Sequence, residues 1–575
     1  MTLPSPEAFV LEPEYDLVIV GSGGGSMCAA LAAAQAGLKP VILEKRDVVG
    51  GSTGFSGGVW WVPDNPVMKR HGAEDSLDRA RRYFAAVVTT KSKGASLARR
   101  EAFLREGPAM VRFLEEQGMK FEYPDGWADY YDDADGGHPR GRSLMARPFD
   151  LNRLGPWKDK VSLYAPWRIL PLGSFTMLGM MMLKRTWKAK AVALRLAATI
   201  AFNRLTGRRV VASGGAIQSR MLEMTLRRGL PLFTGFAAER LVEEDGRVVA
   251  VSGLHQGRRV EVRARHGVLV NCGGFARNEA MRQKYQRHPI SASWTNANPG
   301  DTGEMIEEMM RLGAETENLD LAVWVPTSLK ADGSPPTGAV GKDGQAYPFM
   351  HNADIATPNL IWVDKTGNRF VNEANSYMEL GERMYEVGAV PGFAVFDENH
   401  MQRYPYGSMM PGMKPVQAWL DEGFMLKADT IGELAEKAGI DPAGLAAQVT
   451  RFNRYAETGV DEEFHKGERQ YDRWRGDPTI GPNPCLGPIA RAPFYAIRIF
   501  PGDVGTFGGV VTDESARVLR PDGSIIEGLY ATGNCTSSVM GRFYPGAGAS
   551  ISPSFIFGWI AARHMAQRAG NATRG

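Results

Sequence analysis

The chain has 575 residues, 43% of them hydrophobic, which is enough for two or three domains with cores of their own. Its formal net charge of +3 is small, but the charges are unevenly distributed along the chain. The four cysteines are far apart and form no CxxC pair, which argues against a zinc site and a disulfide framework and favours a reducing compartment. No uninterrupted run of about 20 apolar residues occurs, and residues 1–15 lack the features of a secretory signal, so we expect a cytoplasmic protein without a spanning helix.

The first structured stretch has the pattern of a dinucleotide-binding unit. Residues 16–20 form a short apolar, β-branched run that predicts a buried parallel strand. A glycine-rich turn follows, then an alanine-rich helix from about Met27 to Gly37 and a second strand from Pro40 to Leu43. Glu44 lies about 20 positions beyond the glycines, where it can accept hydrogen bonds from a ribose. The expected cofactor contacts in this unit are Gly21, Gly23, Gly24, Gly25, Ser26, Glu44 and Lys45.

A second glycine cluster, residues 50–58, bears on which dinucleotide is bound. An FAD laid across a sheet needs such an additional loop more than a nicotinamide dinucleotide does, although the pattern alone does not separate the two. Residues 267–274 and 528–534 each read as a buried strand ending in a glycine turn, so we expect the chain to return to one sheet from remote places. The further expected cofactor contacts are Gly51, Ser52, Thr53, Ser56, Gly57, Gly58, Gly273, Gly274, Asp301, Gly533, Asn534, Ser550 and Ile551.

Residues 151–209 form a basic, amphipathic insert. They carry twelve lysines and arginines against a single acidic residue, and an apolar run, Ile169 to Leu183, is flanked by Trp157, Trp167 and Trp187. The 15 residues of that run would reach about 22 Å as a helix, short of the roughly 30 Å hydrocarbon core. We therefore expect the insert to lie on an anionic membrane surface. The alternatives are a helical hairpin packed on the protein or a subunit interface, whereas the methionine and leucine density does not suit a nucleic-acid groove.

Residues 367–373 read Gly-Asn-Arg-Phe-Val-Asn-Glu and are followed by Tyr377. Within a split FAD domain, this stretch resembles the fumarate reductase and succinate dehydrogenase flavoprotein superfamily. Fumarate-reducing members of that superfamily place an arginine in the C-terminal glycine loop to hold a dicarboxylate, and they place a histidine before a Thr-x-Gly-Gly turn. This chain has Tyr544 at the arginine's position, and its turn, residues 504–509, reads Val-Gly-Thr-Phe-Gly-Gly. Without the guanidinium clamp that such a substrate requires, dicarboxylate chemistry is not expected.

The C-terminal glycine loop, residues 541–548, reads Gly-Arg-Phe-Tyr-Pro-Gly-Ala-Gly and resembles the 3-ketosteroid Δ1-dehydrogenases. The stretch Asp129-Tyr130-Tyr131 and the position of Tyr377 agree with the same family. The resemblance implies an FAD-dependent enzyme that removes two hydrogens from carbons 1 and 2 of a 3-ketosteroid and passes electrons to an external acceptor such as a quinone. It further implies that Tyr544 and the Gly548 amide bind the ketone. Tyr377, assisted by Tyr130, would take the proton from carbon 2 while the hydride from carbon 1 goes to FAD.

The predicted fold class is α/β, with a Rossmann-like FAD-binding domain, an inserted α+β catalytic domain and a helical, basic amphipathic insert. We expect the FAD-binding domain at 1–150, 210–320 and 505–575, the insert at 151–209 and the catalytic domain at 321–504. Three other functions remain open: a 3-ketosteroid dehydrogenase acting at the 4,5-bond, an enone-reducing flavoprotein, and a non-catalytic flavin-containing module on a membrane surface. We expect peripheral attachment to the inner face of the cell membrane. We expect no bound metal and no nucleic-acid partner.

Overall fold

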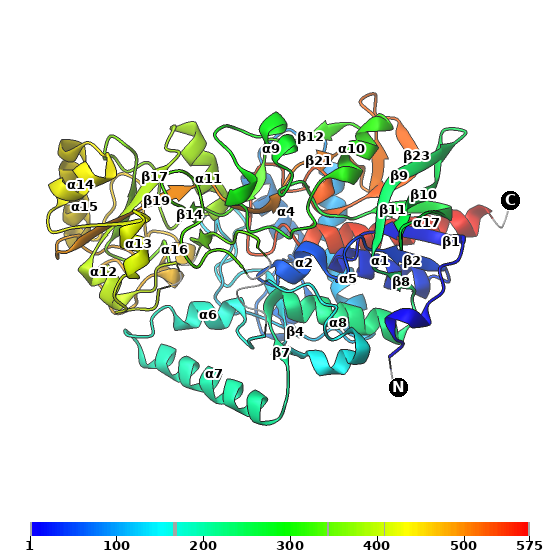
Figure 1. The fold of residues 1–575 in the computed structure, drawn as a ribbon, viewed down its shortest axis with the longest axis horizontal. Helices are drawn as coiled ribbons and strands as arrows, with labels where there is room; N and C mark the ends of the chain where they lie inside the picture. Colours follow the sequence, from blue (N-terminus) through cyan, green and yellow to red (C-terminus); the bar gives the residue numbers. More distant parts are fainter. Residues whose placement is uncertain (1–2, 165–168, 342–343, 353, 408, 573–575) are drawn as a thin grey trace.

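A large mixed sheet forms the centre of the molecule in the computed structural model, which describes residues 3–164, 169–341, 344–352, 354–407 and 409–572 (Figure 1). Its eight strands follow the order β22-β23-β10-β11-β1-β2-β8, with β9 beside β10. β1 (Glu14–Val20) is parallel to both of its neighbours, β2 (Pro40–Leu43) and β11 (Arg258–Val270), and β23 (Ile525–Ala531) is parallel to β11. Strands from three remote parts of the chain therefore meet in one sheet, as the sequence predicts.

The remaining strands of this sheet are β8 (Leu232–Phe233), β9 (Phe236–Glu244), β10 (Arg247–His255) and β22 (Arg517–Leu519). The helices of the same part of the chain are α1 (Gly24–Gln35), α2 (Gly51–Phe55), α3 (Pro66–Arg70), α4 (Leu77–Val87), α5 (Leu97–Gln117), α8 (Ser213–Arg227), α9 (Glu279–Tyr285), α10 (Glu304–Arg311) and α17 (Ser552–Ala572). Smaller sheets are formed by β3 (Val59–Trp61), β4 (Phe121–Glu122) and β5 (Ser143–Ala146), by β6 (Phe149–Asp150) with β7 (Val210–Val211), by β12 (Thr316–Glu317) with β21 (Gly509–Val510), and by β13 (Ala322–Trp324) with β20 (Asp503–Thr506).

Helix α1 begins at Gly24, three residues before the expected start at Met27. Glycine costs about 1 kcal/mol in a helix interior relative to alanine, so a helix that begins with two glycines needs a packing reason. In the fold, the missing side chains make room for α17. A Cβ on Gly24 would lie 2.1 Å from the Phe555 ring, and one on Gly25 would lie 2.2 Å from Ser554 Oγ. Close packing between the two helices therefore decides where α1 begins.

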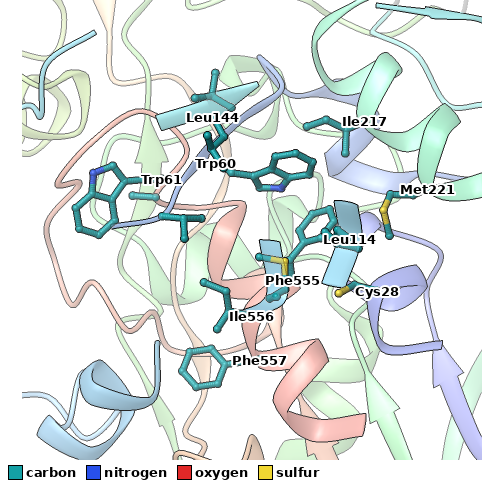
Figure 2. Close-up of a cluster of buried hydrophobic side chains, with 14 of the residues drawn as sticks. Cys28, Trp60, Trp61, Leu114, Leu144, Ile217, Met221, Phe555, Ile556 and Phe557 are labelled. Atoms are coloured by element: carbon teal, nitrogen blue, oxygen red, sulfur yellow. The ribbon is translucent and has the colours of Figure 1, made fainter. Parts of the chain in front are cut away.

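The hydrophobic core beside the sheet collects side chains from several elements (Figure 2). Phe555 of α17 packs edge-on against Trp60 of β3, with ring centroids 5.1 Å apart. Cys28 of α1 and Met221 of α8 border the same cluster, and both side chains are fully buried. This core holds α17, and with it the C-terminal glycine loop that precedes the helix, at a fixed place on the sheet.

A second, six-stranded antiparallel sheet lies at the other end of the molecule, in green, yellow and orange in Figure 1. Its order is β15-β14-β19-β17-β16, with β18 beside β19. The strands are β14 (Thr327–Ser328), β15 (Phe349–Met350), β16 (Leu360–Val363), β17 (Gly392–Asp397), β18 (Met425–Ala428) and β19 (Phe494–Phe500). The accompanying helices are α11 (Tyr377–Glu386), α12 (Glu398–Arg403), α13 (Gln417–Asp421), α14 (Ile431–Ala438), α15 (Pro442–Thr458) and α16 (Gln470–Arg475).

The basic insert forms two helices, α6 (Ser174–Met180) and α7 (Trp187–Leu205), and α7 stands apart from the body along one edge (Figure 1). Trp157 does not belong with the surface tryptophans as expected: it is 1% exposed, and its indole N–H donates to the Pro4 carbonyl at 2.9 Å. Trp167 lies outside the described residues. Within the described ranges, no helix combines the length and apolarity needed to cross a bilayer.

Candidate active site

A cavity of about 1590 Å³ extends from the carboxyl ends of the central strands to the second sheet. Pockets for one small ligand commonly measure about 300–1,000 Å³, so this cavity has room for a large cofactor and a substrate together. Its wall includes the turn after β1, the helices α2 and α6, the start of α11 and the C-terminal glycine loop.

The turn after β1 is shaped for close approach of a ligand to the backbone. Gly21 has φ +98°, and a Cβ there would lie 2.3 Å from the Asn271 carbonyl oxygen, so no other residue fits. A Cβ on Gly23 would meet only Thr53, at 3.7 Å, and Gly23 lines the cavity. Glu44 is buried beside this turn and accepts from the Ser22 hydroxyl at 2.6 Å and the Ser22 amide at 3.1 Å. These features fit the adenosine half of a dinucleotide.

Most of the predicted cofactor residues line the cavity together. They are Gly21, Gly23, Glu44, Lys45, Gly51, Ser52, Thr53, Ser56, Gly57, Gly273, Asp301, Gly533, Asn534, Ser550 and Ile551. Five others, Gly24, Gly25, Ser26, Gly58 and Gly274, do not line it. A Cβ on Gly58 would lie 2.2 Å from the Ser213 backbone and one on Gly274 would lie 1.9 Å from Thr506 Oγ1, so these two glycines allow close packing of neighbouring segments.

Asp301 is a buried carboxyl group in the cofactor part of the cavity. Burial raises its pKa to about 7. The Ser52 hydroxyl, which donates to Oδ2 at 2.8 Å, lowers the pKa but does not offset the burial. A Cβ on Gly273 would lie 2.4 Å from Asp301 Oδ1, so the carboxyl group sits directly against the glycine turn after β11. The group can therefore accept or donate a hydrogen bond near neutral pH.

Four tyrosines from four separate segments meet in the wall of the cavity. The Tyr130 ring lies 5.5 Å from Tyr377 and 5.8 Å from Tyr544 between centroids, and Tyr377 lies 5.2 Å from Tyr544. The fourth member, Tyr471 of α16, lies 4.4 Å from Tyr130 and was not predicted from the sequence. Together these four residues, Tyr130, Tyr377, Tyr471 and Tyr544, are called the tyrosine cluster below.

Burial strongly affects the acidity of the tyrosine cluster. Desolvation raises the pKa of Tyr377 well above its usual value of 10, and the neighbouring phenols of Tyr130 and Tyr544 raise it further. The pKa of Tyr130 is also raised well above 10 by burial, while the positive charge of Arg475 works in the opposite direction. These effects favour the neutral form of the Tyr377 phenol.

The C-terminal glycine loop holds Tyr544 and Gly548 against this cluster. The Tyr544 hydroxyl lies 2.9 Å from Ser550 Oγ. Gly548 has φ +96°, and a Cβ there would lie 2.3 Å from the Val59 carbonyl oxygen, so the position requires glycine. Helix α17 begins at Ser552, shortly after this loop.

Hydrogen bonds to the Pro545 carbonyl join the glycine loop to the segment that carries Tyr130. The Tyr130 amide donates to this oxygen at 3.0 Å and the Tyr83 hydroxyl donates to it at 2.6 Å. The Trp61 ring fills the space beside Gly546, where a Cβ would lie 2.4 Å from it. The relative positions of Tyr130 and Tyr544 are thus fixed by backbone contacts as well as by ring packing.

Arg475 is a second cavity residue that sequence reasoning missed. It lies one helical turn after Tyr471 on α16, and its guanidinium carbon is 4.0 Å from the Tyr471 ring centroid. The i, i+4 spacing of a tyrosine and an arginine was the available signal, because such residues share a helix face. Nothing in the sequence indicated that this face points to the cavity.

Comparisons with known proteins agree with this geometry. The model of the FAD binding domain family matches residues 16–551. The 3-oxosteroid 1-dehydrogenase of Mycolicibacterium smegmatis is 39% identical, over 98% of this chain and 99% of the relative. This chain belongs to the 3-oxosteroid 1-dehydrogenase family. It is an FAD-binding oxidoreductase, as the sequence predicts.

Two other similar proteins are named for different cyclic ketones. The crystal structure of 3-ketosteroid delta1-dehydrogenase from Sterolibacterium denitrificans, in complex with 1,4-androstadiene-3,17-dione, matches with a TM-score of 0.89 at 34% identity, covering 97% of this chain and 100% of the other. The 4-oxocyclohexanecarboxylate 2-dehydrogenase of Sinomonas cyclohexanicum is 33% identical over 96% of this chain and 93% of the relative. Members of the family thus bear names for both steroid and small cyclic ketones.

Proposed function

We propose that this enzyme dehydrogenates the carbon 1–carbon 2 bond of 3-ketosteroids. The observation that carries this proposal is the meeting of Tyr130, Tyr377 and Tyr544 in the wall of one large cavity, within a chain 39% identical to a 3-oxosteroid 1-dehydrogenase. A cavity of about 1590 Å³ has room for a four-ring substrate beside the cofactor. FAD, bound along the glycine turns, supplies the hydride acceptor.

The ketone oxygen is bound by the glycine loop. The Tyr544 hydroxyl donates one hydrogen bond to it and the Gly548 amide donates another. Ser550 Oγ, 2.9 Å from the Tyr544 hydroxyl, holds that hydroxyl in place. Both bonds strengthen as negative charge develops on the oxygen, so they acidify the hydrogens on carbon 2 and lower the barrier to proton removal.

Tyr377 takes the proton from carbon 2 as a phenolate. It is the first residue of α11, where the positive end of the helix dipole favours a negative charge. Tyr130, whose ring centroid is 5.5 Å away, offers a hydroxyl that can donate to the phenolate. The electrons finally pass to an external acceptor, a quinone or a compound of similar chemistry.

The exposed helix α7 supports our proposal of a membrane-surface location. Trp187, Leu194 and Leu205 are 83%, 73% and 88% exposed, and only Ala189 and Asn203 of the helix are buried. The helix carries four basic residues and no acidic one. Exposed apolar side chains together with lysines and arginines suit an anionic bilayer surface. A second copy of the same helix fits less well, because its positive charges would repel.

A vesicle-binding experiment tests the membrane location. We expect the protein to sediment with vesicles of phosphatidylglycerol and phosphatidylcholine, and to stay in the supernatant with phosphatidylcholine alone. The double variant Leu194→Glu/Leu205→Glu should lose this binding. The matched control is Leu97→Glu, which changes a leucine that is 82% exposed but lies outside the insert. This variant should still bind the vesicles. Absence of wild-type sedimentation at low salt would contradict the location without affecting the enzymatic proposal.

Product analysis tests the enzymatic proposal. The purified flavoprotein is incubated with a 3-keto-4-ene steroid and an artificial electron acceptor, and the expected product is the 3-keto-1,4-diene. A 3-ketosteroid saturated at the 4,5-bond is the parallel substrate, and a 4-ene product from it would indicate a 4,5-dehydrogenase. Exclusive turnover of 4-oxocyclohexanecarboxylate would contradict the steroid assignment. No turnover of any ketone would favour a non-catalytic binding module.

A further inference from the structure

A phenolate at Tyr377 requires positive charge in its surroundings, because an isolated negative charge is costly in a buried site. The phenols next to Tyr377 are uncharged, and two nearby ionic side chains already have hydrogen-bond or ion-pair partners. Glu379 is hydrogen-bonded by Asn375 and Tyr131, and Arg469 pairs with Asp472 at 3.0 Å. Arg475 is positively charged and lines the cavity beside the tyrosine cluster.

Arg475 is a buried cation whose hydrogen bonds go to neutral groups. The residue is 7% exposed, Nη1 donates to the Asn352 carbonyl at 2.7 Å, and Nη2 donates to the Ala374 carbonyl. Its Nε is buried and has no hydrogen-bond partner in the described chain. Among the described residues no carboxylate lies within ion-pair distance of Arg475.

Two other buried arginines of the chain have the acidic partners that Arg475 lacks. Arg142 pairs with Asp75 and Asp129, and Arg369 pairs with Glu373 and Asp461. Burying a charge is costly unless an opposite charge or full hydrogen bonding compensates it. Arg475 therefore carries a positive charge that no neighbouring acid in the described structure neutralises.

The tyrosine cluster connects this charge to Tyr377. The Arg475 guanidinium lies over the Tyr471 ring at 4.0 Å, the Tyr471 ring lies 4.4 Å from Tyr130, and Tyr130 lies 5.5 Å from Tyr377. All four side chains line the same cavity. Each ring is polarisable, and hydroxyls in a low-dielectric site can reorient toward a charge that forms beside them.

We propose that Arg475 is a positioning residue that supplies the counter-charge for the Tyr377 phenolate, acting through Tyr471 and Tyr130. This inference rests on the proposed function, in which Tyr377 is the base. The resting Tyr377 hydroxyl releases its proton to solvent before the reaction, and the phenolate then takes the proton from carbon 2. In that state the positive Arg475 and the negative Tyr377 neutralise each other across the cluster.

The pH dependence of anaerobic flavin reduction by a 3-ketosteroid tests this role in the holoenzyme. Arg475→Gln removes the charge and should shift the rising limb of the rate profile to higher pH by about one unit. At a fixed pH on that limb, this shift lowers the rate about tenfold. Arg475→Lys keeps the charge and should restore most of the rate. The control Arg473→Gln alters an exposed arginine of the same helix and should leave the profile unchanged.

A second readout needs no turnover. Ultraviolet difference titration of the holoenzyme against its Tyr377→Phe variant isolates the ionisation of one phenol. We expect this ionisation to move to higher pH in an Arg475→Gln background. If Arg475→Gln does not fold, Tyr471→Phe takes its place, since it keeps the cation but removes the intervening hydroxyl and should shift the profile in the same direction.

The outcomes separate the two proposals. A wild-type flavin that no ketosteroid reduces would overturn the proposed function and, with it, this inference. Normal wild-type reduction with an unshifted profile in Arg475→Gln, or in Tyr471→Phe where the first variant is insoluble, would overturn the role of Arg475 alone. Equal losses in Arg475→Gln and Arg475→Lys without a pH shift would indicate packing rather than charge and would also overturn it.

Discussion

The Arg542 guanidinium donates to the Glu382 carboxylate at 3.1 Å and so joins the C-terminal glycine loop to α11. Arg542 lies two residues before Tyr544, and Glu382 lies on the helix that begins with Tyr377. The same arginine donates to Asp320 at 2.8 Å, and the Trp324 indole donates to the other oxygen of Glu382 at 2.6 Å. These contacts fix the position of Tyr544, the proposed ketone ligand, relative to Tyr377, the proposed base.

We expect Arg542→Gln to lower kcat by about tenfold while thermal stability changes little. The ion pair is partly exposed and contributes about 0–1 kcal/mol to folding, whereas a shift of about 1 Å in a reacting group can cost up to a hundredfold in rate. Glu382→Gln should have a similar effect, and the double variant should be no worse than either single one. Additive losses would show that the two residues do not act together. Arg563→Gln, which breaks a surface pair with Glu106, serves as the control.

Tyr377→Phe should lower kcat by a hundredfold or more, since general base catalysis commonly contributes about a hundredfold to ten-thousandfold. Because we assign the Tyr377 hydroxyl to the substrate and not to the cofactor, flavin content should be unchanged. Steady-state kinetics with a quantified flavin-to-protein ratio measures both. Normal turnover by this variant would remove Tyr377 from the proposed mechanism.

For Tyr544→Phe we expect a fall in kcat of about a hundredfold with KM nearly unchanged. A hydrogen bond that strengthens as charge develops on the ketone acts mainly in the transition state, and one such donor is worth about a hundredfold to a thousandfold. The comparison variant is Ser550→Ala, which removes the hydroxyl beside Tyr544 and keeps the Tyr544 donor, so it should cost less. A Tyr544→Phe enzyme with normal kcat and weakened binding would contradict this role.

The rate of flavin reduction should rise with pH. Tyr377 acts as a base only when deprotonated, and burial raises its pKa well above 10. Below that pKa the phenolate fraction grows about tenfold for each pH unit, so the logarithm of the rate should rise with a slope near 1 between about pH 6 and pH 9. Stopped-flow measurements across this range give the slope, and a profile that falls with pH would exclude a phenolate base.

Local patterns predicted the central sheet and three of the four members of the tyrosine cluster. The strand, glycine turn and acid around Gly21 and Glu44 have the spacing of a dinucleotide-binding unit, so the order of β1, α1 and β2 could be predicted from the sequence. Tyr130, Tyr377 and Tyr544 stood in recognisable motifs, and the structure brings their rings within 5.8 Å of one another.

Tertiary packing decided what the sequence could not predict. The start of α1 depends on Phe555 and Ser554, more than 500 residues away. Trp157 lies in a basic, amphipathic stretch of sequence, but its side chain is buried and its indole N–H donates to the Pro4 carbonyl. Tyr471 and Arg475 carry no motif, and only the docking of α16 against the segment of Tyr130 gives them a place in the cavity wall.

Anaerobic mixing of the holoenzyme with a 3-keto-4-ene steroid tests the central claim most directly. The account predicts that the oxidised flavin absorbance bleaches in a single turnover and that one equivalent of the 3-keto-1,4-diene forms per flavin reduced. A flavin that stays oxidised while the steroid is bound, or a bleached flavin with a product altered elsewhere than carbons 1 and 2, would contradict it.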